Sequence, residues 1–163
     1  MRLPRRNEFH RQVNRAFPPA TLAVIERAIK ASEAAHAGEI RFVVEGALDS
    51  TSLCRGQSAR ERALEIFSQL RVWDTEHNNG VLIYLLLADR DVEIVADRGI
   101  HAKVGAPEWE KICRAMESEF KRAQFEQSVV NAIQAVTQHL ARHVPGAVDG
   151  AGRNELQNHP VVL

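Results

Sequence analysis

The sequence predicts an α/β fold, a three-layer α/β/α sandwich around a small mixed sheet. The segment 81–88 begins with seven apolar residues in succession, which is typical of a central strand buried on both faces. The segment 91–97 alternates apolar with more polar positions and follows a short polar link, which predicts an antiparallel hairpin. Amphipathic helical segments precede and follow the hairpin, and they supply the two outer layers.

Length and composition indicate one globular domain without a charge bias. The chain has 163 residues, of which 45% are apolar and 26% are charged, and 21 Lys and Arg residues balance 21 Asp and Glu residues. This balance argues against nucleic acid as a partner. The start of the chain is locally basic, and we expect residues 1–17 to be a solvated N-terminal segment with a short helix over 6–16.

Cysteine usage and hydropathy indicate the cytoplasm. Cys54 and Cys113 lie far apart and lack the spacing of a disulfide framework or a zinc site, so we expect free thiols in a reducing compartment. No apolar run reaches the roughly 18–20 residues of a bilayer-spanning helix, and the N-terminus lacks the apolar core of a secretory signal. We therefore expect a cytoplasmic protein without a membrane span.

The first half of the chain predicts two helices around one strand. The elements are a helix over 19–36, a strand over 39–45, a polar connection over 46–57 and a helix over 58–70. Gly38 follows the first of these helices, and we expect it to be a left-handed cap. Ser58 and Glu61 match a capping box for the second. The predicted inward positions of the first are Leu22, Ile25, Ile29, Ser32 and His36.

The second half predicts two helices after the hairpin. One begins near residue 107 and the other covers 125–143, because the interval between Phe120 and Phe125 breaks the helical phase. The inner face of the first is predicted to be Trp109, Ile112, Cys113, Met116 and Phe120. We expect the folded domain to span 18–145 and residues 146–163 to form a disordered tail.

The hairpin places polar side chains at one end of the sheet. A link centred on Asp89-Arg90 pairs Tyr84 with Val95, which brings Asp97 beside the residues that precede the central strand. The preceding strand runs parallel and starts at the same end. Carboxylate, amide and imidazole groups are ligand types for divalent metals. The predicted ligand set is Glu76, Asn78, Asn79, Asp97 and His101.

Alternatives to a metal site stay open at this end. An Asn-Gly pair before a strand is usually an ordinary turn, and Asp97 serves equally well as a cap for the following segment. Ligands in open α/β sheets usually bind at the carboxyl ends of parallel strands, where residues 46–56 and 89–91 are expected. The sequence leaves open which end of the sheet carries the functional cleft.

Four segments together resemble the TPM domain family, the thylakoid-lumen and bacterial phosphatase-like domain. They are SEAAHAGEIRFVVE (32–45), ERALEIFSQL (61–70), NNGVLIYLLLADRDVEIVADRGI (78–100) and VGAPEWEKICRAMESEFKRAQFEQSVVNAIQAVTQHLARHVP (104–145). Their order and spacing match over about residues 20–145. The chain is most similar to the short bacterial branch that lacks a signal and an anchor helix.

The resemblance implies an α/β/α sandwich and a divalent-metal site, for calcium in particular, in an acidic cleft at the Asn-Gly end of the hairpin. The chain departs from the family pattern there, with Asn78 in place of Asp and His101 in place of Glu, while Asp97 adds a carboxylate. We expect weaker calcium binding, a shift toward zinc or another transition metal, or no metal. The turn from Lys121 to Gln124 lacks the family's glycine.

The resemblance implies acid phosphatase activity in some members of the TPM domain family and roles in membrane-protein repair or assembly in others. Together with the residues of this chain, it leads to two candidate functions. The first is a non-enzymatic interaction domain, with or without a modulating divalent metal, that acts with envelope or membrane proteins from the cytoplasmic side. The second is a metal-dependent acid-phosphatase-like hydrolase that uses Asp97 and His101. The balanced charge and the incomplete acidic cleft favour the first.

Overall fold

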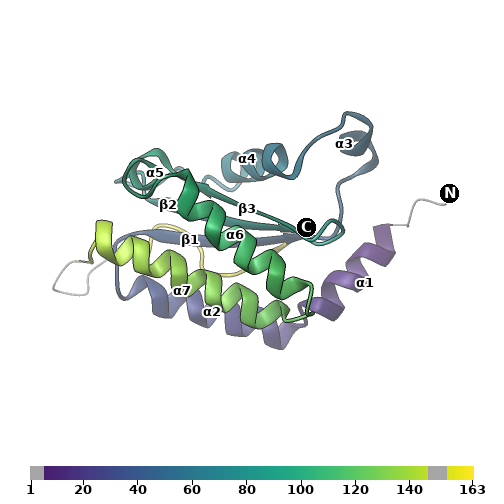
Figure 1. Cartoon of the computed structure of the whole chain (residues 1–163), viewed down its shortest axis with the longest axis horizontal. Coiled ribbons are helices and arrows are strands. Elements are labelled where there is room, and N and C mark those ends of the chain that lie inside the picture. Colours follow the sequence, from purple (N-terminus) through teal and green to yellow (C-terminus); the bar gives the residue numbers. More distant parts are fainter. Residues whose placement is uncertain (1–5, 147–153) are drawn as a thin grey trace.

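The computed structural model describes residues 6–146 and 154–163, and across them it confirms the α/β class (Figure 1). A four-stranded mixed sheet lies at the centre, in the order β3-β2-β1-β4. Its strands are β1 (Glu39–Glu45), β2 (Gly80–Leu86), β3 (Asp91–Ala96) and β4 (Val161–Val162). β1 and β2 are parallel neighbours, and β2 and β3 form the predicted antiparallel hairpin.

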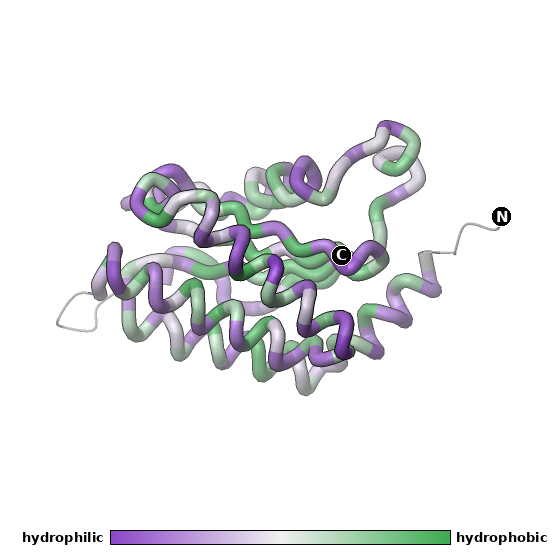
Figure 2. The backbone as a smooth tube through the Cα atoms, viewed as in Figure 1, coloured by the Kyte–Doolittle hydropathy of each residue, from purple (hydrophilic) through white to green (hydrophobic). Residues whose placement is uncertain are grey.

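Helices cover both faces of the sheet, as Figure 1 shows, with α2, α6 and α7 on one face and α4 on the other. Figure 2 shows apolar colour along the strands, and apolar and polar residues in alternation along the helices. The helices in the described part of the chain are α1 (Arg6–Ala16), α2 (Pro19–Glu33), α3 (Ser50–Cys54), α4 (Ala59–Gln69), α5 (Arg98–Val104), α6 (Ala106–Phe120) and α7 (Phe125–His143).

The central strand β2 is buried on both faces, as its apolar run predicts. Every residue of β2 is buried. Val81, Ile83 and Leu85 pack on the side of α2, α6 and α7, whereas Leu82 and Tyr84 pack on the side of α4. Alternation along a strand sends successive side chains to opposite faces, so the absence of polar positions follows from helices on both sides.

Helix ends confirm two local predictions. The capping box opens α4, because Ser58 donates its backbone N–H to Glu61 Oε2 at 2.8 Å and Ser58 Oγ accepts from Glu61 N at 3.1 Å. A turn separates α6 from α7 where the helical phase breaks. In that turn Ala123 has a φ of 57°, so alanine adopts the left-handed conformation that glycine would take at lower cost.

The hairpin register differs from the predicted one by two residues. Tyr84 pairs with Glu93 instead of Val95, because the turn takes four residues, 87–90, in place of two. Arg90 closes this turn with a left-handed φ of 51°. β2 and β3 are accordingly shorter than the predicted 81–88 and 91–97. A shift of two residues keeps each side chain on its predicted face.

The first long helix ends earlier than predicted. α2 stops at Glu33, and its C-cap Ala34 has ordinary helical angles. Gly38 is not a left-handed cap, since it is not among the residues with positive φ. It is instead needed for close packing, because a Cβ there would lie 2.6 Å from Leu140 Cδ2.

Two short helices were not predicted. α3 lies inside the segment expected to be a loop, and Asp49 caps it by accepting from Ser52 N at 2.7 Å. α5 follows β3 directly and buries only Ile100. Helices of five and seven residues are too short to show an apolar stripe, so periodicity does not reveal them.

The prediction of a disordered tail over 146–163 is wrong for residues 154–163. β4 adds to the outer edge of β1 as a parallel strand, and Leu163 donates its backbone N–H to Val44 O at 2.9 Å. Leu156 and Val161 pack against the apolar cluster on the α4 face. Hydrogen bonding and packing together order this segment, while residues 1–5 and 147–153 lie outside the described chain.

Within residues 6–146 and 154–163, no helix combines the length and hydropathy that crossing a bilayer requires.

Candidate functional site

The residues predicted to form a metal site gather where β2 begins and β3 ends. Asp97 donates its backbone N–H to Gly80 O at 2.8 Å, and Asn78 O accepts from Ile100 N at 3.2 Å. Asn78 has a left-handed φ of 52°, which asparagine tolerates better than most residues. The structure therefore brings the two segments together at the predicted end of the sheet.

Asp97 and Asn79 make local contacts and keep one free oxygen each. Asp97 Oδ1 accepts from Arg98 N at 2.7 Å and caps α5. Asn79 is 1% exposed and donates from Nδ2 to Ala37 O at 3.0 Å. Asp97 Oδ2 and Asn79 Oδ1 are buried without a hydrogen-bond partner among the described residues. Unpartnered buried acceptors are uncommon, and oxygen is the donor that hard cations prefer.

Two of the other predicted ligands, Glu76 and His101, have surroundings that differ from those of these two oxygens. The Glu76 side chain is 72% exposed, and the His101 side chain lines a groove beside α6. In the part of the chain that the structure describes, no three His, Cys, Asp or Glu side chains are grouped to hold a metal ion. The metal site stays a prediction, and Asn79 and Asp97 are the residues best placed to serve it.

A buried acid pair that was not predicted as a site lies at the same end. Glu39 is 3% exposed, and its Oε1 accepts from Glu155 N at 2.9 Å. Glu33 accepts from Ile40 N at 3.4 Å. Burial, followed by the charge of Glu39, raises the pKa of Glu33 from 4.5 to about 8. Burial also raises the pKa of Glu39, and we expect Glu33 to hold the proton between them.

The C-terminal segment lies against this pair and helps to bury Glu39, while Glu33 stays half-buried. Besides Glu155, Gln157 contacts β1, with Arg41 Nη1 donating to Gln157 O at 2.5 Å. The hydrogen bond from Asn158 to Glu33 opposes the rise in the pKa of Glu33. Because the segment was expected to be disordered, the sequence offered no signal that Glu33 and Glu39 share a covered site.

The opposite end of β1 holds a closed ion-pair network. Arg62 donates to both oxygens of Glu45, at 2.9 and 3.0 Å, and Tyr84 OH donates to Glu45 Oε2 at 2.7 Å. The hydrogen bond to Glu45 raises the pKa of Arg62, and burial raises the pKa of Tyr84. The carboxyl end of the parallel strands, where ligands usually bind, is thus occupied by a structural network.

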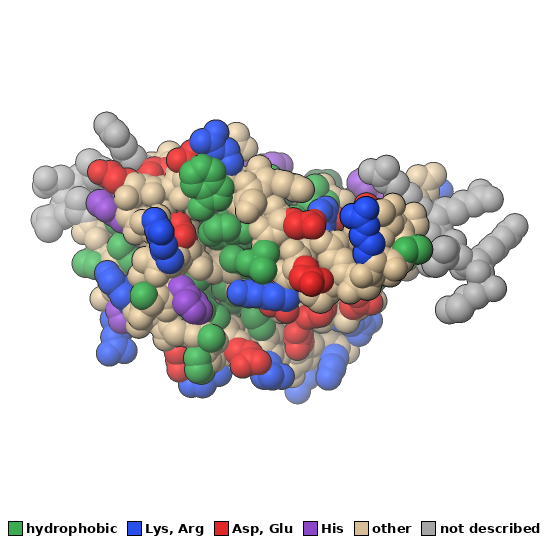
Figure 3. Space-filling model, turned by 90° about the horizontal axis from the view of Figure 1, so that it is seen from above, with side chains coloured by type: hydrophobic (Ala, Val, Ile, Leu, Met, Phe, Trp, Pro, Cys, Tyr) green, Lys and Arg blue, Asp and Glu red, His purple; other side chains and the backbone are tan. Residues whose placement is uncertain are grey.

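Exposed apolar side chains gather on the α4 side of the molecule. Seen from this side in Figure 3, apolar side chains form a strip that has charged groups on both flanks. Leu64 on α4 is 45% exposed, and Trp73 in the following segment is 46% exposed. Arg71 lies over the Trp73 ring at 5.3 Å from its centroid, a cation–π contact. Clustered exposed apolar groups are typical of contact surfaces.

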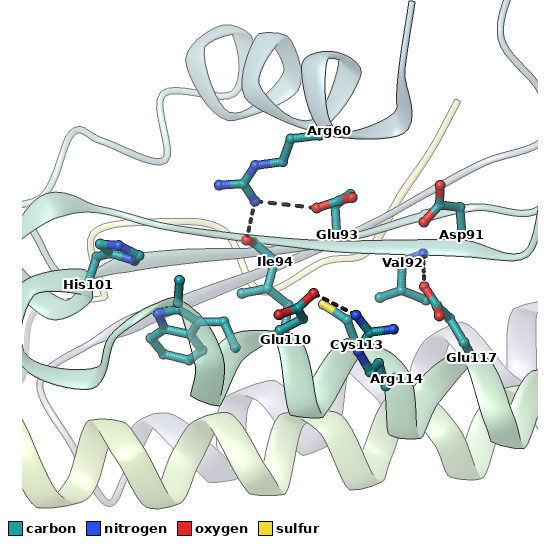
Figure 4. A pocket seen from close by; sticks show the side chains of 12 residues that line it. Arg60, Asp91, Val92, Glu93, Ile94, His101, Glu110, Cys113, Arg114 and Glu117 are labelled. Atoms are coloured by element: carbon teal, nitrogen blue, oxygen red, sulfur yellow. Dashed lines mark hydrogen bonds and ion pairs between the residues drawn. The ribbon is translucent and has the colours of Figure 1, made fainter.

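A groove lies beside the edge strand β3. It has a volume of about 410 Å³ and lies between β3, α4 and α6 (Figure 4). Val92, Ile94 and Trp109 contribute apolar side chains, and Cys113 lies among them. Burial raises the pKa of the Cys113 thiol to about 12, so it is not a thiolate nucleophile at neutral pH. We call this feature the β3 groove.

Charged side chains from α4, α6 and β3 line the β3 groove (Figure 4). Arg60 pairs with Glu93 at 3.4 Å and Arg114 pairs with Glu110 at 2.7 Å. Burial raises the pKa values of Asp91 and Glu93. Sequence reasoning missed this groove, although charges at positions 110, 114 and 117 follow one side of α6. That spacing does not reveal which strand lies opposite the helix.

Comparisons with known proteins agree on one family and fold. The family model described as "TPM domain" matches residues 13–139. The BA42 protein from the psychrophilic bacterium Bizionia argentinensis is 28% identical, with a TM-score of 0.74 over 88% of this chain and 93% of that chain. The N-terminal domain of a protein from P. gingivalis is 18% identical, with a TM-score of 0.65 over 90% and 99% of the two chains. No curated protein matches this chain closely.

Proposed function

The chain belongs to the TPM domain family, and we propose that it works as an interaction domain that binds a membrane or envelope protein from the cytoplasmic side. The observation that carries this proposal is the β3 groove together with the apolar strip beside it. Arg60 lines the groove, and Leu64 lies one helical turn further along the same side of α4. The Leu64 part of the strip therefore adjoins the groove, and we take the two together as the partner surface.

The composition of this surface is that of a protein contact and not of a closed active site. Its centre is apolar, through Ile94 and Trp109, and its rim is charged. Interfaces have the same division into an apolar core and a polar rim. The Arg60–Glu93 and Arg114–Glu110 pairs are solvent-accessible and worth about 1 kcal/mol or less each, so a partner can rearrange them at low cost.

The experiment is affinity capture from solubilised membranes with matched variants. We expect the wild-type chain to retain a membrane protein and Leu64→Asp to lose most of it, because a charge replaces an exposed apolar contact. Leu163→Asp is the control, since Leu163 is 44% exposed and follows β4 at the opposite edge of the sheet. Equal retention by both variants, or no retained protein, would overturn the proposal.

A divalent cation forms the second part of the proposal. Calcium or a transition metal would bind at the strand ends, where the free oxygens of Asn79 and Asp97 support it. The bound cation would neutralise the charge of Asp97 and join the segment that precedes β2 to the segment that follows β3. We expect metal analysis of the purified protein to find a divalent ion, and we expect less of it in Asp97→Asn. Titration calorimetry should show that Asp97→Asn also binds the added ion more weakly.

The same two oxygens favour a second candidate function, a metal-dependent acid-phosphatase-like hydrolase. Asp97 would then act as a ligand, and His101, whose side chain lies in the β3 groove, would have to turn toward it to act as a ligand or proton donor. Hydrolysis of p-nitrophenyl phosphate that stops with a chelator and is lost in both Asp97→Ala and His101→Ala would establish this function in place of the first. Turnover that survives both substitutions would remove these residues from the reaction.

A further inference from the structure

The outer edge of β3 carries backbone groups that no strand satisfies within the described part of the chain. β3 is the last strand of the sheet. Asp97 donates to Gly80 across the hairpin, so in this register residues 91, 93 and 95 direct their backbone groups toward β2. The N–H and C=O groups of residues 92, 94 and 96 therefore point away from the sheet, and Val92 and Ile94 line the β3 groove.

Two side chains occupy the places that a further strand would take. Glu117 Oε1 accepts from Val92 N at 3.3 Å, and Arg60 Nη1 donates to Ile94 O at 2.6 Å (Figure 4). They supply an acceptor and a donor, as the carbonyl and amide of a neighbouring strand do. The bond from Val92 is long, and the Arg60 side chain is 49% exposed. Both groups can swing into solvent when a strand arrives.

The turn end of the groove gathers acidic side chains, and a hydrogen bond between Asp91 and Glu117 partly offsets the rise in the pKa of Asp91. The other groove carboxylates are paired with arginines, whereas within the described residues neither Asp91 nor Glu117 has a cationic partner. Asp89 lies next to Asp91 in the turn, and its charge adds to the burial that raises the pKa of Asp91. A cationic side chain at this end would relieve the repulsion between these carboxylates.

We propose that the β3 groove binds an extended peptide segment of a partner protein, which pairs with the outer edge of β3 and places a Lys or Arg side chain between Asp91 and Glu117. The inference rests on the proposed interaction function and specifies the chemistry of its partner. β3 has six residues, so a segment of about six residues would match it at roughly 3.4 Å per residue. Arg60 and Glu117 are the placeholders that such a strand would displace.

The test is a selection of displayed random peptides, each about ten residues long to exceed the length of β3, on the full chain. We expect the selected peptides to share a basic residue within an extended, β-branched sequence. In fluorescence anisotropy their affinity should fall at least about tenfold for Asp91→Asn with Glu117→Gln, the loss expected for a charge-assisted contact. Glu8→Gln on α1 removes one exposed carboxylate away from the groove and should leave the affinity unchanged.

Backbone pairing has a separate signature. On addition of a selected peptide, amide hydrogen exchange should slow at Val92 and Ile94, and Arg60→Ala should bind at least as tightly as wild type because the placeholder is gone. The inference is overturned if the selection does not enrich basic peptides, or if the double variant Asp91→Asn, Glu117→Gln binds them as tightly as wild type. Amide exchange at Val92 and Ile94 that does not change when the peptide is added would overturn it as well. If the double variant Asp91→Asn, Glu117→Gln still captures the membrane partner in full, the inference is refuted. The proposed function would then still stand.

Discussion

Replacing Glu33 by glutamine should make the protein more stable at alkaline pH and leave it unchanged in acid. Burial and the neighbouring charge of Glu39 raise the pKa of Glu33 from 4.5 to about 8. At neutral pH the folded protein therefore retains a proton that the unfolded chain has released. In Glu33→Gln the side-chain amide keeps a donor toward Glu39 and an acceptor for Ile40 N without needing that proton.

The sign and size follow from linkage. Below pH 4.5 both states hold the proton and Glu33 has no effect, whereas stability falls between pH 4.5 and about 8 and then levels off. At about 1.36 kcal/mol per pH unit the whole interval corresponds to about 5 kcal/mol. Solvent access to the half-buried side chain reduces this to about 2 kcal/mol. Glu33→Gln should therefore gain about 2 kcal/mol above pH 8.

Urea unfolding at about pH 3.5, 7 and 9, which lie on both sides of the unfolded pKa of 4.5 and the folded pKa of about 8, measures this difference. Glu8→Gln is the control, because Glu8 is exposed on α1, and its effect should stay within about 0.5 kcal/mol at every pH. A free-energy difference for Glu33→Gln that is the same at all three values would refute the protonated acid pair. So would a wild type that is more stable than the variant at the most alkaline pH.

Three further substitutions test the packing at Gly99, the strain in the α6–α7 turn and the hydrogen bond to Glu45. Gly99→Ala should cost about 1–3 kcal/mol by overpacking, because the new Cβ would lie 2.6 Å from Asn78 O. Ala123→Gly should raise stability by about 0.5–1 kcal/mol, since glycine adopts a left-handed φ without strain, and differential scanning calorimetry would show the higher melting temperature. Tyr84→Phe should cost about 1–2 kcal/mol in urea unfolding by removing a donor from the buried Glu45 carboxylate.

Each substitution has an outcome that contradicts its reasoning. Gly146→Ala is matched to Gly99→Ala, because its new Cβ would meet nothing nearer than 3.6 Å. Equal cost at both positions would show that the close approach at Gly99 is not what matters. A less stable Ala123→Gly would exclude strain in the turn between α6 and α7. A neutral Tyr84→Phe would mean that Glu45 is satisfied by Arg62 alone.

The sequence predicted the architecture because its long elements have clear periods. The run 81–87 has no polar position, and the structure buries it between helices on both faces. The α6 stripe from Trp109 to Phe120 is buried as predicted. Short elements were missed, because α3 and α5 have too few residues to repeat an apolar pattern. β4 was missed because two residues of edge pairing leave no periodic signal.

The candidate site was harder to predict, because it depends on contacts between distant segments. The proximity of Asn79 and Asp97 followed from the hairpin alone, even with the register displaced by two residues. The acid pair needed the C-terminal segment, through Glu155, which sequence pattern did not place. The β3 groove needed the angle at which α6 crosses the sheet. Side-chain spacing along one helix carries no information about that angle.

Photo-crosslinking tests the central claim, that the β3 groove is the partner surface of this TPM domain, most directly. A photoreactive amino acid would replace Glu110 at the groove or, as a control, exposed Lys30 on α2. Each protein would be irradiated with membranes and the adducts identified by mass spectrometry. We predict one membrane-protein adduct from position 110 and none from position 30. The same adducts from both positions, or none from position 110, would contradict the account.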